Sequence, residues 1–448
     1  MPAPLLASLL AVWEDVFGAA LTRPSFANLL VVATGWVLME APTHTITEAL
    51  LAAGVVGREH HEAFHRLFSR GTWDPDHVGY WLVQRLLAHA GPGSVRVVLD
   101  DTVASKKGPH VFGLGTHVDA ARSTKRYRIF TFGHCWVVLA VLLRVPFSSR
   151  AWALPVLFRL YRNTKECEKN GAAYAKKTEL AREMLDVFCR WVPERRVEVT
   201  ADSAYCNDTV MRALAERVVV IGAMRPDAVL TAAPPPHKGV GRPRVRGDLL
   251  PKPEQLAKDA ATPWETCEAF VYGRTIQMRY KTIVAQWYRA CGTRLLRVVV
   301  VATEKGTVPY RVFFSTETAL DARAIAETYA SRWGIEVFFR DAKQLFGFAD
   351  SPARKKAAVL RMAPFVGLLY STLVLWFLDG AHTSPHAAPP VRPWYTHKSG
   401  TSFGDILRAA RRVLRGADVL DPANHLKNLH NSRPAAKPPA RRALDIAA

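Results

Sequence analysis

The sequence predicts an α/β fold in which a core of alternating strands and helices is interrupted by a β-rich insertion. Three observations indicate this. The first 90 or so residues have helical periodicity, short β-branched runs then alternate with helical segments, and this alternation stops near residue 226 and resumes near residue 310. We expect a helical N-terminal region, two parts of a core around the insertion, and a basic C-terminal tail: residues 1–92, 93–225, 226–309, 310–380 and 381–448.

Composition indicates a globular protein with a polyanionic partner. The chain has 448 residues, 49% of them hydrophobic, which is enough for two or three domains with a sizeable core. Lys and Arg number 60 against 39 Asp and Glu, a net charge of +21. Such an excess favours nucleic acid as a partner, with an anionic membrane surface second and genomic base composition as the neutral explanation. The six cysteines form no C-x-x-C pair, which argues against a disulfide framework or a cysteine zinc site.

The N-terminal region is predicted to be helical. In WDPDHVGYWLVQRLLAHAG, Asp74 can cap a helix, Pro75 suits its first position, and Gly91 follows its last turn. Residues 45–68 predict two short helices around a turn at Gly54–Gly57. This pattern fits a helix-turn-helix that would bind DNA. It also fits an ordinary helical hairpin.

Strands and helices alternate from residue 95 onwards. VRVVLDD (95–101) and VEVTADSAY (197–205) are strand-like runs that end in acids, and residues 125–143 supply one or two further strands. A helical period covers residues 174–191, and RVVVIGAM (217–224) is another strand. This alternation is typical of an α/β core.

The insertion begins with a Pro/Gly/basic stretch and continues with strand-like runs. The GRPR sequence at 241–244, beside Lys238 and Arg246, resembles a hook that binds the DNA minor groove. A solvated loop with general phosphate affinity explains it as well. YRVFFS (310–315) then returns the chain to the core as a strand.

A long helix is predicted from its cap at Asp321 to Gly347. At about 100° per residue, four of its chemically active side chains lie within about a 60° arc: Tyr329, Arg332, Glu336 and Lys343. One carboxylate, two cations and a phenol therefore share a single stripe of that helix.

The end of the chain contains an apolar run and a basic tail. Ala363–Leu378 is sixteen apolar residues, which is short for a membrane span and predicts a buried core helix. Residues 391–448 hold eleven Lys or Arg and four Asp, with a helix expected only over FGDILRAARRVLRG.

Three acids stand out by position. Asp101 and Asp202 end two strands, and Glu336 lies on the polar stripe, so they can meet at the edge of the sheet. Converging carboxylates repel one another unless divalent cations compensate them, and two such ions can promote an in-line phosphoryl displacement. Taken singly, each acid also fits a surface group or a helix cap. Asp100 and Asp101 point to opposite strand faces, and the pattern alone does not choose between them.

These residues resemble a known family. The spacing Tyr329-x2-Arg332-x3-Glu336-x6-Lys343 matches the Y-R-E-K signature of a group of bacterial insertion-sequence transposases, cut-and-paste enzymes with a DDE triad on an RNase H-like core. The Asp101-Thr102 pair looks like the first-acid motif of that group, and VTADSAY looks like the second. The resemblance covers about residues 95–378.

The resemblance implies roles for six residues. Asp101, Asp202 and Glu336 would be catalytic and would hold two Mg²⁺ or Mn²⁺ ions; Asp101 is chosen because the family places the acid directly before Thr. Tyr329, Arg332 and Lys343 would bind phosphates of double-stranded DNA at the transposon end.

The resemblance also implies an activity and its setting. It implies cleavage at inverted repeats, excision through a DNA hairpin and strand transfer into target DNA. The partners expected are that DNA and a second copy in a synaptic homodimer, in the bacterial cytoplasm at the nucleoid, with no membrane. Two alternatives stay open: a DNA-binding descendant without catalysis, and a metal-dependent nuclease without joining.

One competing motif is set aside. His61 and His65 form an H-E-x-x-H pattern typical of zinc proteases. Zinc catalysis needs a third ligand, and the extended metzincin form fails because Phe68 and Gly71 stand where Gly and His are required.

Overall fold

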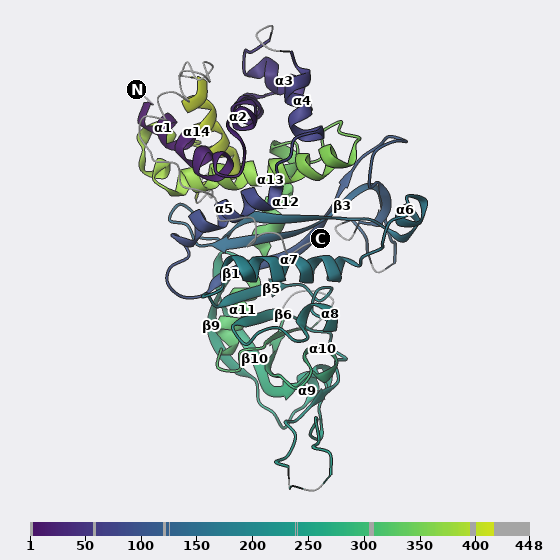
Figure 1. Ribbon diagram of the computed structural model, residues 1–448. Helices are drawn as coiled ribbons and strands as arrows, with labels where there is room; N and C mark the ends of the chain where they lie inside the picture. Colours follow the sequence, from purple (N-terminus) through teal and green to yellow (C-terminus); the bar gives the residue numbers. More distant parts are fainter. Residues whose placement is uncertain are drawn as a thin grey trace. The chain divides into compact units, whose positions relative to one another are not determined.

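The computed structural model describes residues 3–56, 60–119, 122–124, 126–237, 239, 241–303, 309–394 and 400–415. Figure 1 shows the chain as a ribbon. It divides into two compact units. The first comprises residues 1–86, 104–114 and 340–448, and the second comprises residues 87–103 and 115–339. The domain boundaries expected from the sequence remain predictions.

A twelve-stranded mixed sheet forms the centre of the second unit, within the part of the chain that the structure describes. Its order is β2-β3-β1-β5-β6-β12-β11-β10-β7-β8, with β4 beside β3 and β9 beside β10. The strands are β1 Val95–Ser105, β2 Gly115–Val118, β3 Phe130–Leu143, β4 Trp152–Tyr161, β5 Val197–Ala201, β6 Val218–Ala223, β7 Leu230–Thr231, β8 Leu249–Leu250, β9 Glu265–Val271, β10 Arg274–Gln286, β11 Leu295–Ala302 and β12 Tyr310–Ser315.

The core of this sheet confirms the predicted RNase H-like fold class. β5 pairs in parallel with both β1 and β6, while β3 and β4 pair antiparallel. All five residues of β5 are buried, as expected for a central strand that is covered on both faces. Helix α7 (Lys177–Trp191) connects β4 to β5 and packs against β3 and β4 (Figure 1). The short helices α6 (Thr164–Lys169) and α8 (Asp208–Met211) flank these elements.

The β-rich insertion extends the same sheet. β12 returns antiparallel to β6, and β11 and β10 follow it in antiparallel order. β9 and β10 form a hairpin whose turn residues, Tyr272 and Gly273, have positive φ angles of 52° and 83°. Two positive φ angles match the right-handed twist of a hairpin. Helices α9 (Pro253–Lys258) and α10 (Tyr288–Cys291) complete the insertion.

The prediction of one uninterrupted helix from Asp321 to Gly347 is wrong. Asp321 does cap a helix and Gly347 has the positive φ of a terminator, but α11 (Ala322–Ser331) ends before α12 (Trp333–Leu345) begins. Bonds from Arg332 N–H to the Tyr329 carbonyl and from Ile335 N–H to the Arg332 carbonyl tighten the junction. A Cβ on Gly334 would lie 2.9 Å from the Ala151 carbonyl oxygen, so the junction brings backbone close to backbone.

The first unit is helical. Its helices are α1 Ala3–Trp13, a π-helical turn Glu14–Gly18, α2 Arg23–Leu38, α3 Ile46–Ala52, α4 Glu62–Ser69, α5 Pro75–Leu87, α13 Lys356–Leu378 and α14 Phe403–Arg415, with 3₁₀ turns at Ala381–Thr383 and Pro385–Ala387. The helical character expected for residues 1–92 and the helix expected in the tail are both confirmed. The stretches 395–399 and 416–448 of that tail lie outside the described residues.

Helix α13 is the core helix that the apolar run predicted. It is long and apolar enough to cross a membrane, yet 89% of its most apolar window is buried within the protein. It packs against α1, α4 and α14 (Figure 1). The Tyr370 ring lies 4.2 Å from the Phe403 ring of α14. The apolar run in the sequence therefore reflects a helix that is mostly buried within the protein.

The motifs set aside or left open have the following structure. Gly57, the last residue of the turn expected at Gly54–Gly57, lies outside the described part of the chain, as does Lys238. The His61 and His65 rings are 5.9 Å apart, and among the residues described no group of three His, Cys, Asp or Glu is arranged to hold a metal. The 241–244 loop is exposed, and Arg246 stacks 4.8 Å from the Tyr288 ring.

Candidate active site

Two acids meet where the pairing of the parallel strands β1 and β5 ends. Asp202 follows the last residue of β5, but β1 continues to Ser105, so the expectation that Asp101 ends its strand is wrong. The last registered pair of these strands is Leu99 with Ala201, so Asp100 and Asp202 follow it in step. Side chains at equivalent positions of neighbouring parallel strands point to the same face of the sheet. Asp202 therefore lies close enough to raise the pKa of Asp100 by charge repulsion.

Arg332 joins the third acid to this pair. Its Nη1 lies 2.7 Å from Asp100 Oδ2, and its Nη2 lies 2.5 Å from Glu336 Oε1. The Arg332 and Asp100 side chains are only 15% and 16% exposed, whereas Glu336 is 33% exposed. The forked guanidinium thus holds a strand carboxylate and a helix carboxylate at once.

The ionisation of Asp100 reflects this crowding. Burial raises the pKa of Asp100 to about 7; Arg332 opposes the rise, and the charge of Asp202 adds to it. A raised pKa means that the protonated form of Asp100 is favoured. A further cation nearby would stabilise the ionised form.

Asp101 faces a different set of partners. Lys177 Nζ lies 2.6 Å from Asp101 Oδ2, the Tyr205 hydroxyl donates to Oδ1 at 2.7 Å, and Cys135 Sγ lies 3.4 Å from Oδ2. Lys177 also lies 5.5 Å from the Tyr161 ring. Both oxygens of Asp101 are therefore already bound by this chain.

The remaining two residues of the predicted stripe lie on different helices, Tyr329 on α11 and Lys343 on α12. The Tyr329 ring packs 4.5 Å from the Phe313 ring, and Arg332 lies 5.7 Å over it. Burial raises the pKa of Tyr329. Lys343 is half-buried two turns beyond Glu336 on α12 and belongs to the first unit. Their predicted contacts with phosphate remain predictions.

The donor chemistry fits a divalent metal. Asp100, Asp202 and Glu336 offer hard carboxylate oxygens, the ligands that Mg²⁺ prefers. The guanidinium of Arg332 lies between Asp100 and Glu336, where a metal ion would otherwise supply the positive charge. In the described residues these acids do not form a ready-made three-ligand group, so a metal would require Arg332 to release at least one of them.

Sequence reasoning missed the residues around Asp101. Tyr205 follows Asp202 by three positions in VTADSAY, and its bond to Asp101 ties the loop of the second acid to β1. That spacing was visible in the sequence, but nothing local pointed to the partner. Lys177 at the start of α7 and Cys135 on β3 carry no sequence signal, because their role depends on strand order.

Comparison with known proteins identifies the family. A model of the DDE superfamily endonucleases matches residues 16–284, a segment that includes Asp100, Asp101 and Asp202 but ends before Glu336. Among solved structures, the chain is similar to a piggyBac transposase synaptic complex with hairpin DNA, with a TM-score of 0.43 and 9% identity over 98% of this chain and 86% of that one. A comparison with curated proteins gave no match. Because the family model matches more than half of the sequence, the chain belongs to the DDE superfamily endonucleases.

Proposed function

We propose that this endonuclease is a DNA transposase that cleaves the inverted-repeat ends of an insertion sequence and joins them to target DNA. One observation carries the proposal: in a chain of this family, Arg332 bridges Asp100 and Glu336 while Asp202 lies beside Asp100. Family membership supports a nuclease, and the Y-R-E-K spacing is the reason to propose a transposase in particular.

We propose Asp100, rather than Asp101, as the first catalytic acid. Asp100 shares a face with Asp202 and a bridging cation with Glu336, whereas Asp101 is bound by Lys177 and Tyr205 on the other face. The choice of Asp101 from the family's acid-before-Thr pattern stays a prediction. The two alternatives give opposite mutational results, which the Discussion sets out.

The chain's own residues take the following roles in the proposal. Asp100, Asp202 and Glu336 would hold two Mg²⁺ or Mn²⁺ ions, which when bound supply Lewis acidity for phosphoryl transfer. Arg332, released from one or both acids, presents its planar fork to a phosphate. Tyr329 and Lys343 are the other two residues proposed to bind DNA. Asp101, with Lys177 and Tyr205, positions the loop that carries Asp202.

The proposed partner is double-stranded DNA, both transposon ends and target. The net charge of +21 supports affinity for a polyanion. A homodimer that brings two ends together, in the bacterial cytoplasm at the nucleoid, completes the proposal.

The test is an assay with a labelled terminal inverted repeat and an unlabelled plasmid target, with and without Mg²⁺. We expect Mg²⁺-dependent nicking followed by labelled plasmid. A shifted but uncut repeat would instead indicate a DNA-binding descendant. Cleavage with no joined product would indicate a nuclease, and either result overturns the transposase proposal.

A further inference from the structure

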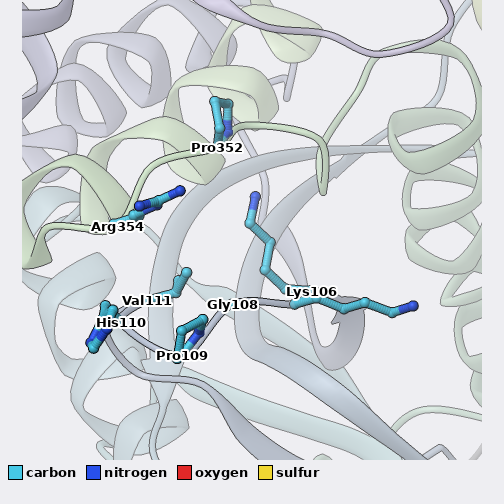
Figure 2. Close-up of a pocket in the computed structure, with 8 residues that line it drawn as sticks. Lys106, Gly108, Pro109, His110, Val111, Pro352 and Arg354 are labelled. Carbon is cyan, nitrogen blue, oxygen red and sulfur yellow. The ribbon is translucent and has the colours of Figure 1, made fainter.

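A small basic pocket lies within the first unit, outside the proposed active site. Its volume is about 290 Å³, which is at the lower end for ligand sites and suits a small group. Residues 106–111, which follow β1, form one wall, and Pro352 and Arg354, which precede α13, form the other. In Figure 2 the Lys106 and Arg354 side chains extend from these two segments towards the side of the pocket where Pro352 lies.

The two walls are fastened to each other. The Phe112 N–H donates to the Arg354 carbonyl at 2.9 Å, and Lys106 Nζ donates to the Ala349 carbonyl at 3.3 Å. Lys356 lies 5.8 Å over the Phe112 ring. These contacts join residues that are more than 240 positions apart in sequence. The pocket is therefore formed by tertiary structure that the contacts hold in place.

Charge in the pocket is of one sign. Lys106, Lys107 and Arg354 contribute cationic side chains, and none of the eight described residues that line the pocket is acidic. The acid that acts on Lys106 is Asp350, outside the lining, and it already accepts from the His44 N–H at 3.0 Å. Burial lowers the pKa of Lys106. An anion in the pocket would stabilise the charged form of this half-buried ammonium.

The adjoining helix adds to this excess of positive charge. α13 starts two residues after Arg354, with Lys355 as its cap residue and Lys356 as its first residue. Its first turn contains no acid, and no side chain caps it. Cations are unfavourable at the positive end of a helix dipole, so a basic start to a 23-residue helix disfavours the fold unless an anion offsets it.

We propose that this pocket binds a phosphate group of the DNA backbone. The inference rests on the proposed function for the identity of the polymer. An ammonium and a guanidinium facing one space are the side chains that bind phosphate oxygens, and such contacts position a protein on DNA without reading its sequence. Lys107, Pro109 and Arg354 are exposed, so the pocket is accessible to a polymer as well as to a free ion.

The test compares two charge-matched double variants on random-sequence duplex DNA in EDTA, where no cleavage occurs. Lys106→Gln with Arg354→Gln removes two pocket charges and keeps a polar side chain at each position. The control, Arg70→Gln with Lys165→Gln, removes two charges from exposed positions outside the pocket. Dissociation constants are measured from about 50 to about 200 mM salt, the range over which counterion release dominates affinity.

We expect the pocket variant to bind DNA on the order of tenfold more weakly at low salt. Its slope of log K against log salt should be smaller by about 0.9 for each phosphate no longer neutralised. Equal slopes in pocket and control variants would overturn the proposal. Lys107→Gln, an exposed change that cannot disturb packing, should give a smaller shift in the same direction if the double variant fails to fold.

A second arm separates DNA from a free ion. Line broadening of the ³¹P signal of inorganic phosphate should appear with wild-type protein and disappear with the pocket variant. Phosphate binding with an unchanged DNA slope would assign the pocket to a free anion and overturn the DNA proposal. Because neither arm requires catalysis, failure of the inverted-repeat assay would leave this result standing, and failure here would leave that assay untouched.

Discussion

At the scale of single residues, two neighbouring carboxylates have different environments because a strand alternates its faces. Asp100 faces Arg332 and Asp202, while Asp101 faces Lys177 and Tyr205. The sequence could predict that a strand carries this acid pair, although β1 continues beyond the pair to Ser105. It could not predict which acid faces the helix, because that depends on strand pairing between distant segments.

Replacing each acid by its amide distinguishes the proposed roles of Asp100 and Asp101. We expect Asp100→Asn to lower the single-turnover cleavage rate by about a thousandfold or more, because loss of a metal ligand removes several kcal/mol of transition-state stabilisation. Asp101→Asn should cost less than about tenfold, since Tyr205 can still donate to the remaining oxygen. DNA binding, measured in EDTA, should stay near wild type in both. The reverse order of effects would restore Asp101 as the first acid.

Arg332 should compete with metal for the acids. In the DNA-free protein, Arg332→Ala removes a cation that touches Asp100 and Glu336, so we expect Mn²⁺ to bind about tenfold more tightly. The same variant should cleave DNA more slowly, and Arg332→Lys should not restore the rate because an ammonium lacks the bidentate fork. Electron paramagnetic resonance of free Mn²⁺ measures the affinity. Weaker Mn²⁺ binding in Arg332→Ala would contradict the competition.

At the scale of elements, the helix break at Arg332 shows where tertiary contact overrides a local pattern. The apolar period continues through residues 322–345, so periodicity alone predicts one helix. The two helices instead meet at Arg332, beside Gly334, where an added Cβ would lie 2.9 Å from the Ala151 carbonyl oxygen. Strand β4 escaped prediction for a related reason: its buried run WALPVLFRLY has no alternation, because β4 is covered on both faces.

The loop after β5 should depend on its link to β1. Tyr205→Phe removes a hydrogen bond to a carboxylate, which costs about 1–3 kcal/mol of the free energy of unfolding. We expect the Mg²⁺ concentration for half-maximal cleavage to rise, because the loop also carries Asp202. A purely structural role would lower stability and leave the Mg²⁺ dependence unchanged. Titrating Mg²⁺ in single-turnover cleavage by both proteins decides between these outcomes.

The loop between α12 and α13 should depend on pH through Asp350. Burial alone would raise the pKa of Asp350, but hydrogen bonds from the His44 side chain and N–H outweigh it and lower the pKa. A lowered carboxyl pKa contributes stability above the unfolded-state value, near 4, and that contribution is lost as pH falls through the folded-state value. Urea unfolding should therefore show Asp350→Asn less stable by roughly 1 kcal/mol at pH 7 and equal to wild type near pH 2. A difference that persisted at pH 2 would exclude this ionisation as its source.

At the scale of the whole molecule, local sequence predicted the fold class but not the order of the strands in the sheet. Helical regions, strand-like runs and the basic charge all follow from local pattern. Strand order does not, because the pairing of β1 with β3 and of β6 with β12 joins segments far apart in sequence. The helical unit likewise draws on three separate segments.

That discontinuity constrains how the protein can be made. Helices α1 to α5 leave the ribosome first, yet α13, against which α1 and α4 pack, is synthesised more than 250 residues later. The apolar faces of α1 and α4 stay exposed until α13 is available to cover them. Residues 1–86 expressed alone should therefore be recovered mainly as aggregate. Co-expression with residues 340–448 should raise the soluble fraction measured by sedimentation, whereas a soluble, folded 1–86 fragment would contradict this order of assembly. A nascent chain cut short before α13 would therefore lack a folded helical unit even when the sheet and its acids had already been translated.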